Sequence, residues 1–216
     1  AVRRHFCRRT EMIYHGIDLA DWAPAEERHG YVLWDKNRVD PICSPRPLDE
    51  LAEIMPDQGF VTTYGTARPN VEVIGPQTWA NSRELTRHAG AYLATSLETF
   101  GLATIQALAA GVPVVGYRWG ATEEIVRDGV DGILVEPGDV EGLRRAVIEV
   151  LRWPAGKVNA DRWTWDGPME AYARLYDRVA AERRPDPLVS VVVTSYNLAR
   201  YLPSALASVS TQRTDY

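Results

Sequence analysis

The sequence is short of the features that mark membrane, secreted and nucleic-acid-binding proteins. No apolar run approaches the ~20 residues that a membrane-spanning helix needs, and no basic segment with an apolar run and a cleavage site opens the chain. The net charge of -5 argues against a nucleic-acid surface, which needs clustered Lys and Arg. The two cysteines, Cys7 and Cys43, lack the spacing of a metal site or a disulfide framework, so we expect free thiols in a reducing cytoplasm.

What is present is the composition of an ordinary globular protein, with 45% apolar and 25% charged residues. A length of 216 residues allows one full domain and a piece of another. The first residue is Ala rather than Met, and the last residue directly follows a helical pattern. We therefore expect both ends to be cut from a longer chain.

The most informative stretch is residues 91–116, AYLATSLETFGLATIQALAAGVPVVG. Residues 91–95 predict a strand, residues 101–110 predict a helix that a glycine ends, and residues 112–115 predict a second strand. Strand, loop, helix and strand form a crossover unit of the kind that builds parallel sheets. Ligands of such sheets bind beyond the carboxyl ends of the strands, where a starting helix offers unpaired N–H groups, so we expect a site at this loop.

Two residues of the loop suggest what that site binds. Gly101 has no side chain, so we expect a phosphate or sugar to approach the N–H groups of Gly101 and Leu102. Glu98 is a carboxylate, which suits sugar hydroxyls that donate to it better than it suits phosphate. The alternative is that Glu98 only caps the helix and that Phe100 belongs to the core.

The runs SLETFGLATIQALAAGVPVVG and GATEEIVRDGVDGILVEPGD resemble the donor-binding half of the group 1 (retaining, family four) glycosyltransferases. The resemblance implies an α/β fold for residues 1–182: a Rossmann-like parallel sheet with helices on both faces, one half of a GT-B fold. It also implies a nucleotide diphosphate sugar such as a UDP-sugar as donor, no metal or other cofactor, and an acceptor domain that precedes this chain. The isolated half is then expected to bind donor and to be inactive alone.

The resemblance assigns roles to individual residues. A Glu at the position of Glu98 contacts hydroxyls of the transferred sugar in the family, which makes Glu98 the candidate catalytic residue. A second Glu, eight positions later, contacts the ribose, and here that position is Gln106. Because an amide replaces a carboxylate, we expect the nucleotide affinity to fall at most about tenfold. The implied donor-binding residues are Lys36, Arg38, Ile74, Gly75, Glu98, Thr99, Phe100, Gly101, Leu102 and Gln106.

The diphosphate and the base have weaker signals. Arg38 matches a family Arg that grips the diphosphate, and a guanidinium can hold two phosphate oxygens at once. The Lys-Gly that follows in the family is missing, so Arg46 or Lys36 is expected to substitute for it. Ile74 and Gly75 correspond to the backbone that meets the nucleotide base.

Three segments lie outside the crossover unit. Residues 11–22 predict a strand that enters a turn at His15 and Gly16, with a structural role for His15. Residues 163–182 carry aromatic and apolar side chains at spacings of three and four, which predicts a packed helix. In the resembled family this helix crosses to the other domain, so here it is expected to pack differently or to join two copies in a homodimer.

The end of the chain resembles a different enzyme class. Residues 183–187 predict a linker, and residues 188–216 resemble the first strand and helix of the group 2 (inverting) glycosyltransferases, with Thr194, Tyr196 and Asn197 at the nucleotide edge. The chain stops before the acidic metal-binding pair of such enzymes, so this truncated domain is expected to be inactive here.

Two other functions remain compatible with the sequence. One is a nucleotide-sugar-binding module that has lost catalysis, which Gln106 and the altered phosphate loop suggest. The other is a nucleotide-sugar epimerase of the same fold. A nicotinamide-dependent enzyme is disfavoured, because residues 35–41 lack the glycine fingerprint that such enzymes carry after the first strand.

Overall fold

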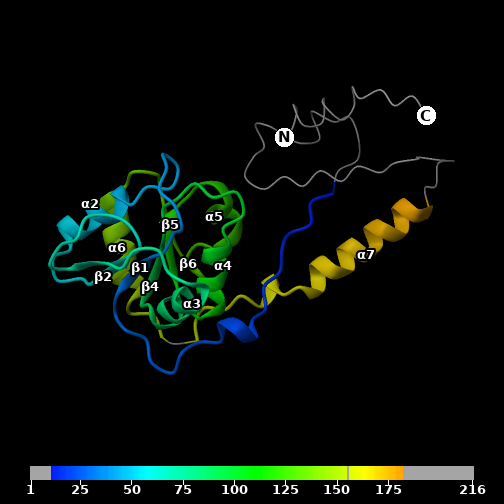
Figure 1. The fold of residues 1–216 in the computed structure, drawn as a ribbon, viewed down its shortest axis with the longest axis horizontal. Helices are drawn as coiled ribbons and strands as arrows, with labels where there is room; N and C mark the ends of the chain where they lie inside the picture. The colour runs from blue at the N-terminus through cyan, green and yellow to red at the C-terminus, as the bar shows by residue number, and fades with distance from the viewer. Residues whose placement is uncertain (1–10, 155, 182–216) are drawn as a thin grey trace. The chain divides into compact units, whose positions relative to one another are not determined.

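In the part of the chain that the structure describes, six short parallel strands form one sheet (Figure 1). The computed structural model describes residues 11–154 and 156–181. The strand order is β3-β2-β1-β4-β5-β6 and every paired neighbour is parallel. The strands are β1 (Val32–Trp34), β2 (Phe60–Thr62), β3 (Val71–Val73), β4 (Ala91–Ala94), β5 (Val114–Tyr117) and β6 (Gly132–Val135).

Helices cover both faces of this sheet, as Figure 1 shows. On one face lie α2 (Arg46–Ile54) and α6 (Val140–Val150). On the other face lie α3 (Trp79–His88), α4 (Leu102–Ala109) and α5 (Gly120–Ile125). The predicted α/β class, a Rossmann-like parallel sheet with helices on both faces, is confirmed.

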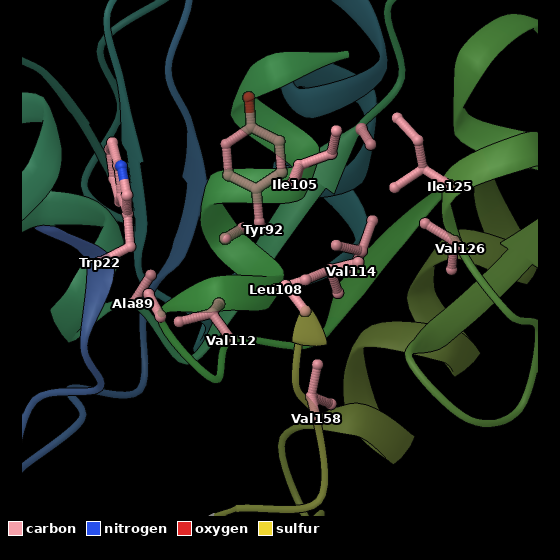
Figure 2. Close-up of a cluster of buried hydrophobic side chains, with 14 of the residues drawn as sticks. Trp22, Ala89, Tyr92, Ile105, Leu108, Val112, Val114, Ile125, Val126 and Val158 are labelled. Carbon is pink, nitrogen blue, oxygen red and sulfur yellow. The ribbon is translucent and has the colours of Figure 1, made fainter. Parts of the chain in front are cut away.

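The central strands β1, β4 and β5 are runs of apolar residues because both of their faces are buried, whereas the edge strand β3 carries the exposed Glu72. In β4, Tyr92 and Ala94 enter the core beneath α4, whereas Ala91 and Leu93 enter the core beneath α2 and α6. Figure 2 shows the first of these cores, where Tyr92 lies beside Ile105 of α4. Successive strand residues point to opposite faces, so this division follows from the strand period of two.

Two predicted strands differ from the structure. The strand predicted at residues 112–115 begins later, at Val114, because the Val112 N–H still donates to the Ala107 carbonyl at the end of α4 (2.8 Å). The strand predicted within residues 11–22 is wrong: the segment holds only a 3-10 turn, η1 (Ala20–Trp22). Its Ile17 N–H donates to the Trp163 carbonyl (2.8 Å), a single contact that builds no ladder.

The helix predicted within residues 163–182 begins later than expected. A short 3-10 turn, η2 (Asp161–Trp163), precedes α7 (Asp166–Ala181). Pro168 has no N–H and its ring clashes with a preceding turn of helix, so it restricts α7 to a start close before it. Trp163 is buried, but no residue of α7 is buried within this chain, and the alternative that the helix joins two copies stays a prediction.

Several predictions concern parts of the chain outside the described residues. They are the predicted linker 183–187, the second domain at 188–216 with Thr194, Tyr196 and Asn197, and the Cys7 thiol. The chain divides into residues 1–170 and 171–216, and of the second unit the structure describes only 171–181. Within the described ranges, no helix combines the length and apolarity needed to cross a membrane.

Candidate functional site

The site lies where the sheet changes direction. From β1 the chain proceeds to β2 on one side, and from β4 it proceeds to β5 on the other, although β1 and β4 pair with each other. The loops after these two strands therefore diverge at their carboxyl ends, which is where open parallel sheets bind ligands. The two loops touch: the Leu97 N–H donates to the Ile42 carbonyl (2.8 Å).

A buried ion pair joins the two loops. Lys36 Nζ lies 3.0 Å from Glu98 Oε1, with side-chain exposures of 7% for Lys36 and 20% for Glu98. The backbone of Lys36 is fixed by Thr63, whose hydroxyl accepts from the Lys36 N–H (2.9 Å) and donates to the Lys36 carbonyl (2.8 Å). Burial opposes the charge of Lys36, but Tyr92 and the Glu98 carboxylate outweigh it and raise the pKa of Lys36. The ammonium is therefore fully charged at neutral pH.

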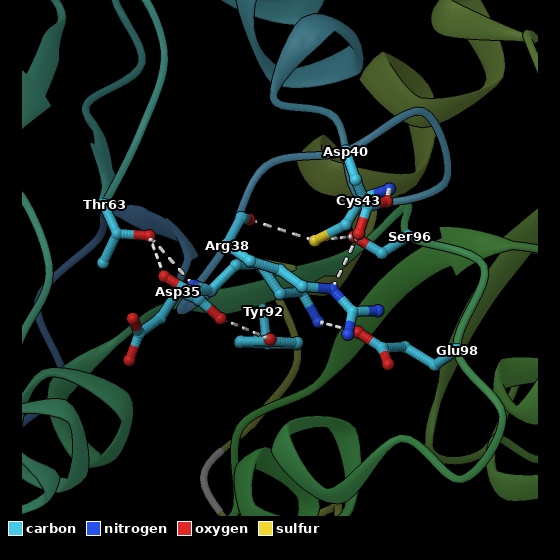
Figure 3. A network of polar contacts seen from close by, with 9 residues as sticks. Asp35, Arg38, Asp40, Cys43, Thr63, Tyr92, Ser96 and Glu98 are labelled. Carbon is cyan, nitrogen blue, oxygen red and sulfur yellow. Dashed lines mark hydrogen bonds and ion pairs between the residues drawn. The ribbon is translucent and has the colours of Figure 1, made fainter. Parts of the chain in front are cut away.

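Arg38 lies in the same loop and is more open to solvent. Its Nε lies 2.8 Å from Asp40 Oδ2, and its side chain is 43% exposed (Figure 3). In the described part of the chain, this is the one ion pair of the guanidinium, so its two terminal nitrogens face no carboxylate. Arg46 is different, because it is 81% exposed and pairs with Glu50 at the start of α2.

The start of α4 supplies backbone donors. Gly101 is its N-cap, in the left-handed conformation (φ 78°), and no side chain caps the helix. The N–H groups of Leu102 and Ala103 meet no acceptor among the residues that the structure describes, as expected of a first turn. The alternative that Glu98 caps this helix is wrong, because its carboxylate bonds Lys36 instead.

The structure shows a different reason for a glycine at position 101 from the one expected. A Cβ at this position would lie 2.8 Å from Ile125 Cδ1, so the space beside the glycine is filled by α5 and is not open to a ligand. Glycine is required by the positive φ and by the close approach of α5. Only the backbone N–H groups of Gly101 and Leu102 therefore remain available to bind an anion.

The other predicted residues lie around this centre in different environments. Gln106 is half-buried on α4, and Thr99 is exposed in the loop. Phe100 is half-buried and packs against the core, with its ring edge-on to those of His15 (5.0 Å between centroids) and Trp163 (6.2 Å). The packing alternative for Phe100 and the structural role of His15 agree with these contacts.

Ile74 and Gly75 follow β3, away from the ion pair. The Gln77 side-chain amide donates to both of their carbonyls (2.9 and 3.1 Å), and Gly75 has a positive φ of 70°. Ile74 also lines a surface cavity of about 490 Å³ that runs along α3 as far as Tyr31 and His88. Ile74 is therefore placed beside a hollow with Gly75 next to it, and in the described residues no hydrogen bond joins either of them to Lys36 or Glu98.

Sequence reasoning missed Thr63 and Asp40. Thr63 lies far from Lys36 in the sequence, so no local pattern connects them. Asp40 accepts the N–H groups of Ile42 (3.0 Å) and Cys43 (2.9 Å), and an Asp before Pro at the start of a loop is a signal for this kind of turn. No group of three or more His, Cys, Asp or Glu in the described ranges is placed to hold a metal ion.

A six-stranded parallel sheet in this order, with charged loops meeting at its switch point, is the Rossmann-like half of a GT-B fold. Residues 54–152 match the family model for glycosyl transferases group 1.

The curated relatives carry names of the same class. The D-inositol 3-phosphate glycosyltransferase of Mycolicibacterium vanbaalenii is 25% identical over an aligned region that covers 82% of this chain and 49% of the relative. The phosphatidyl-myo-inositol mannosyltransferase of Mycobacterium leprae is 31% identical over 121 residues, which cover 51% of this chain and 32% of the relative. The chain spans about half the length of the first of these relatives.

Solved structures show the same architecture. Sucrose-phosphate synthase from Thermosynechococcus elongatus gives a TM-score of 0.68 at 18% identity, covering 84% of this chain and 56% of the other. Anabaena HepE in complex with UDP-glucose gives 0.64 at 18% identity, covering 79% of this chain and 57% of the other. At these identities the likeness establishes the fold.

Proposed function

We propose that this chain is the donor-binding half of a retaining glycosyltransferase that transfers a sugar from a nucleotide diphosphate sugar to an acceptor. The observation that carries the proposal is the grouping of Glu98, Lys36 and Arg38 at the switch point of the sheet, beside the uncapped start of α4. One neighbour of the same fold was solved in complex with UDP-glucose, which supports a UDP-sugar as donor.

Each group has a proposed task in sugar transfer. Departure of the nucleoside diphosphate leaves negative charge on its phosphate oxygens. The Arg38 guanidinium and the first N–H groups of α4 stabilise that charge, and such preorganised donors lower the barrier where charge develops. Glu98 accepts from hydroxyls of the transferred sugar, and Lys36 holds the carboxylate in place through their ion pair. In this proposal the cations take the part that a metal ion plays in other transferases.

The acceptor site is proposed to belong to a half of the enzyme beyond this chain, because the relatives are about twice as long. The fragment is therefore proposed to bind donor and to transfer little or no sugar alone. A second candidate is a nucleotide-sugar-binding module without catalysis, which the amide at Gln106 favours. Product analysis of the intact parent separates the two: a glycosylated acceptor supports the transferase.

Calorimetric titration of the chain with UDP and GDP tests the proposal. We expect saturable binding of one of them, and we expect Gln106→Glu to tighten it by up to about tenfold, since a carboxylate accepts from both ribose hydroxyls. Gln106→Leu is the matched control and should weaken binding of the same nucleotide. No heat with either nucleotide, in the native chain and in Gln106→Glu, would contradict the proposal.

A further inference from the structure

Asp40 holds both the loop after β1 and the arginine within it. Its Oδ1 accepts the N–H groups of Ile42 (3.0 Å) and Cys43 (2.9 Å), which closes the loop on itself. Its Oδ2 lies 2.8 Å from Arg38 Nε (Figure 3). One carboxylate therefore uses one oxygen for the backbone and the other for the guanidinium.

Asp40 contacts Nε of Arg38, and this determines which part of the guanidinium remains for a ligand. A guanidinium offers two forks, one formed by Nε and a terminal nitrogen and the other by the two terminal nitrogens. Asp40 occupies Nε and thereby leaves the end-on fork, which matches the two oxygens of a phosphate. Arg38 is 43% exposed, so a ligand can reach that end.

The same loop is tied to the loop that carries Glu98. The Cys43 thiol donates to the Arg38 carbonyl (3.4 Å) and accepts from the Ser96 hydroxyl (3.5 Å). Cys43 and Ser96 are both buried, with exposures of 2% and 1%. These contacts fix the backbone of Arg38 relative to the strand end that leads to Glu98.

We infer that Asp40 is a positioning residue for phosphate: it presents the terminal fork of Arg38 to the diphosphate of the donor. The inference rests on the proposed function, and it adds a residue that the family resemblance does not supply. Because Asp40 restricts a long side chain before the ligand arrives, less conformational freedom is lost on binding.

Asp40→Asn separates the two tasks of the carboxylate. The amide keeps an acceptor oxygen for Ile42 and Cys43, but it presents its NH₂ group, a donor, to Arg38 Nε. In the full chain we expect the melting temperature to stay unchanged and the affinity for UDP to fall about fivefold, as expected when one side chain loses its preorganisation. In an Arg38→Ala background, the same substitution should leave the affinity for UDP unchanged.

The dependence on background separates positioning from a structural role. If Asp40→Asn lowers the affinity for UDP in the Arg38→Ala background as well, the inference is overturned. Asp40 would then affect binding through the shape of the loop and not through Arg38. Native affinity in Asp40→Asn would overturn it as well and would leave the proposed function standing. Failure of the unmodified chain to bind UDP and GDP would instead contradict the proposed function itself.

Discussion

Replacement of Glu98 by leucine is expected to lower the free energy of unfolding by about 3 kcal/mol, the lower end for breaking a buried ion pair. The substitution leaves the Lys36 ammonium, 7% exposed, without its carboxylate. Because Glu98 is 20% exposed, water relieves part of the cost. Urea denaturation measures the loss, and the slope of the transition should stay constant if the unfolded state is unchanged.

The double variant Glu98→Leu with Lys36→Met is the control for this prediction. It removes both charges and replaces them by apolar side chains of similar size, so we expect it to recover most of the stability. Lys36→Met alone should cost less than Glu98→Leu, because Glu98 keeps some contact with water. Equal losses in the single Glu98→Leu and the double variant would show that the pair contributes only by packing.

The direction in which the pKa of Lys36 is shifted determines the pH at which the variants should be compared. The pKa of Lys36 is raised in the folded protein: burial opposes this, but Tyr92 and Glu98 outweigh burial. A group of this kind contributes stability that is complete below its unfolded pKa of about 10.4 and is lost as the pH rises through the folded pKa. Comparison at pH 7 therefore captures the full effect.

Gly120→Ala is expected to lower the free energy of unfolding by about 2–4 kcal/mol, from strain at a positive φ and from a clash. Gly120 has a φ of 53°, and a Cβ there would lie 2.7 Å from the Glu98 carbonyl and 2.9 Å from Leu97 Cδ1. The Ala121 N–H also donates to that carbonyl (3.0 Å), so the start of α5 supports the loop directly. We expect the displaced loop to weaken binding of UDP-glucose.

Gly129→Ala is the matched control for this prediction. Its φ of 76° is also positive, but nothing lies within 4 Å of a Cβ there. Backbone strain alone should cost about 1 kcal/mol, and the affinity for UDP-glucose should be unchanged. If both variants lose the same stability and affinity, the contact of Gly120 with the Glu98 loop is irrelevant to the site.

The sheet and its helices could be predicted because their information is local. The strands β4 and β5 are short apolar runs, and α4 lies within the residues 101–110 for which the sequence predicts a helix. The placement of Glu98 after β4 followed from the rule that ligand sites collect at the carboxyl ends of parallel strands. Arg38, which follows β1, was assigned from the family resemblance.

The contacts within the site could not be predicted in the same way. Lys36 meets Thr63 and Glu98, which lie 27 and 62 positions away, and these pairs depend on strand order rather than on any periodic pattern. Gly101 is a similar case. It must lack a side chain because a Cβ there would approach Ile125 of α5 too closely, and α5 is distant in the sequence. The prediction for residues 11–22 was wrong because it used the local pattern alone. The pattern predicted a strand, but no strand lies beside this segment to form a ladder.

We propose that a glycosyl diphosphate binds at the start of α4, beside Glu98. Amide chemical shifts of the full, ¹⁵N-labelled chain during a titration with UDP-glucose test it most directly. We expect the largest saturable changes at the N–H groups of Leu102 and Ala103. Changes that are largest along the cavity beside α3, at Asn81 and Glu84, with Leu102 and Ala103 unaffected, would contradict it.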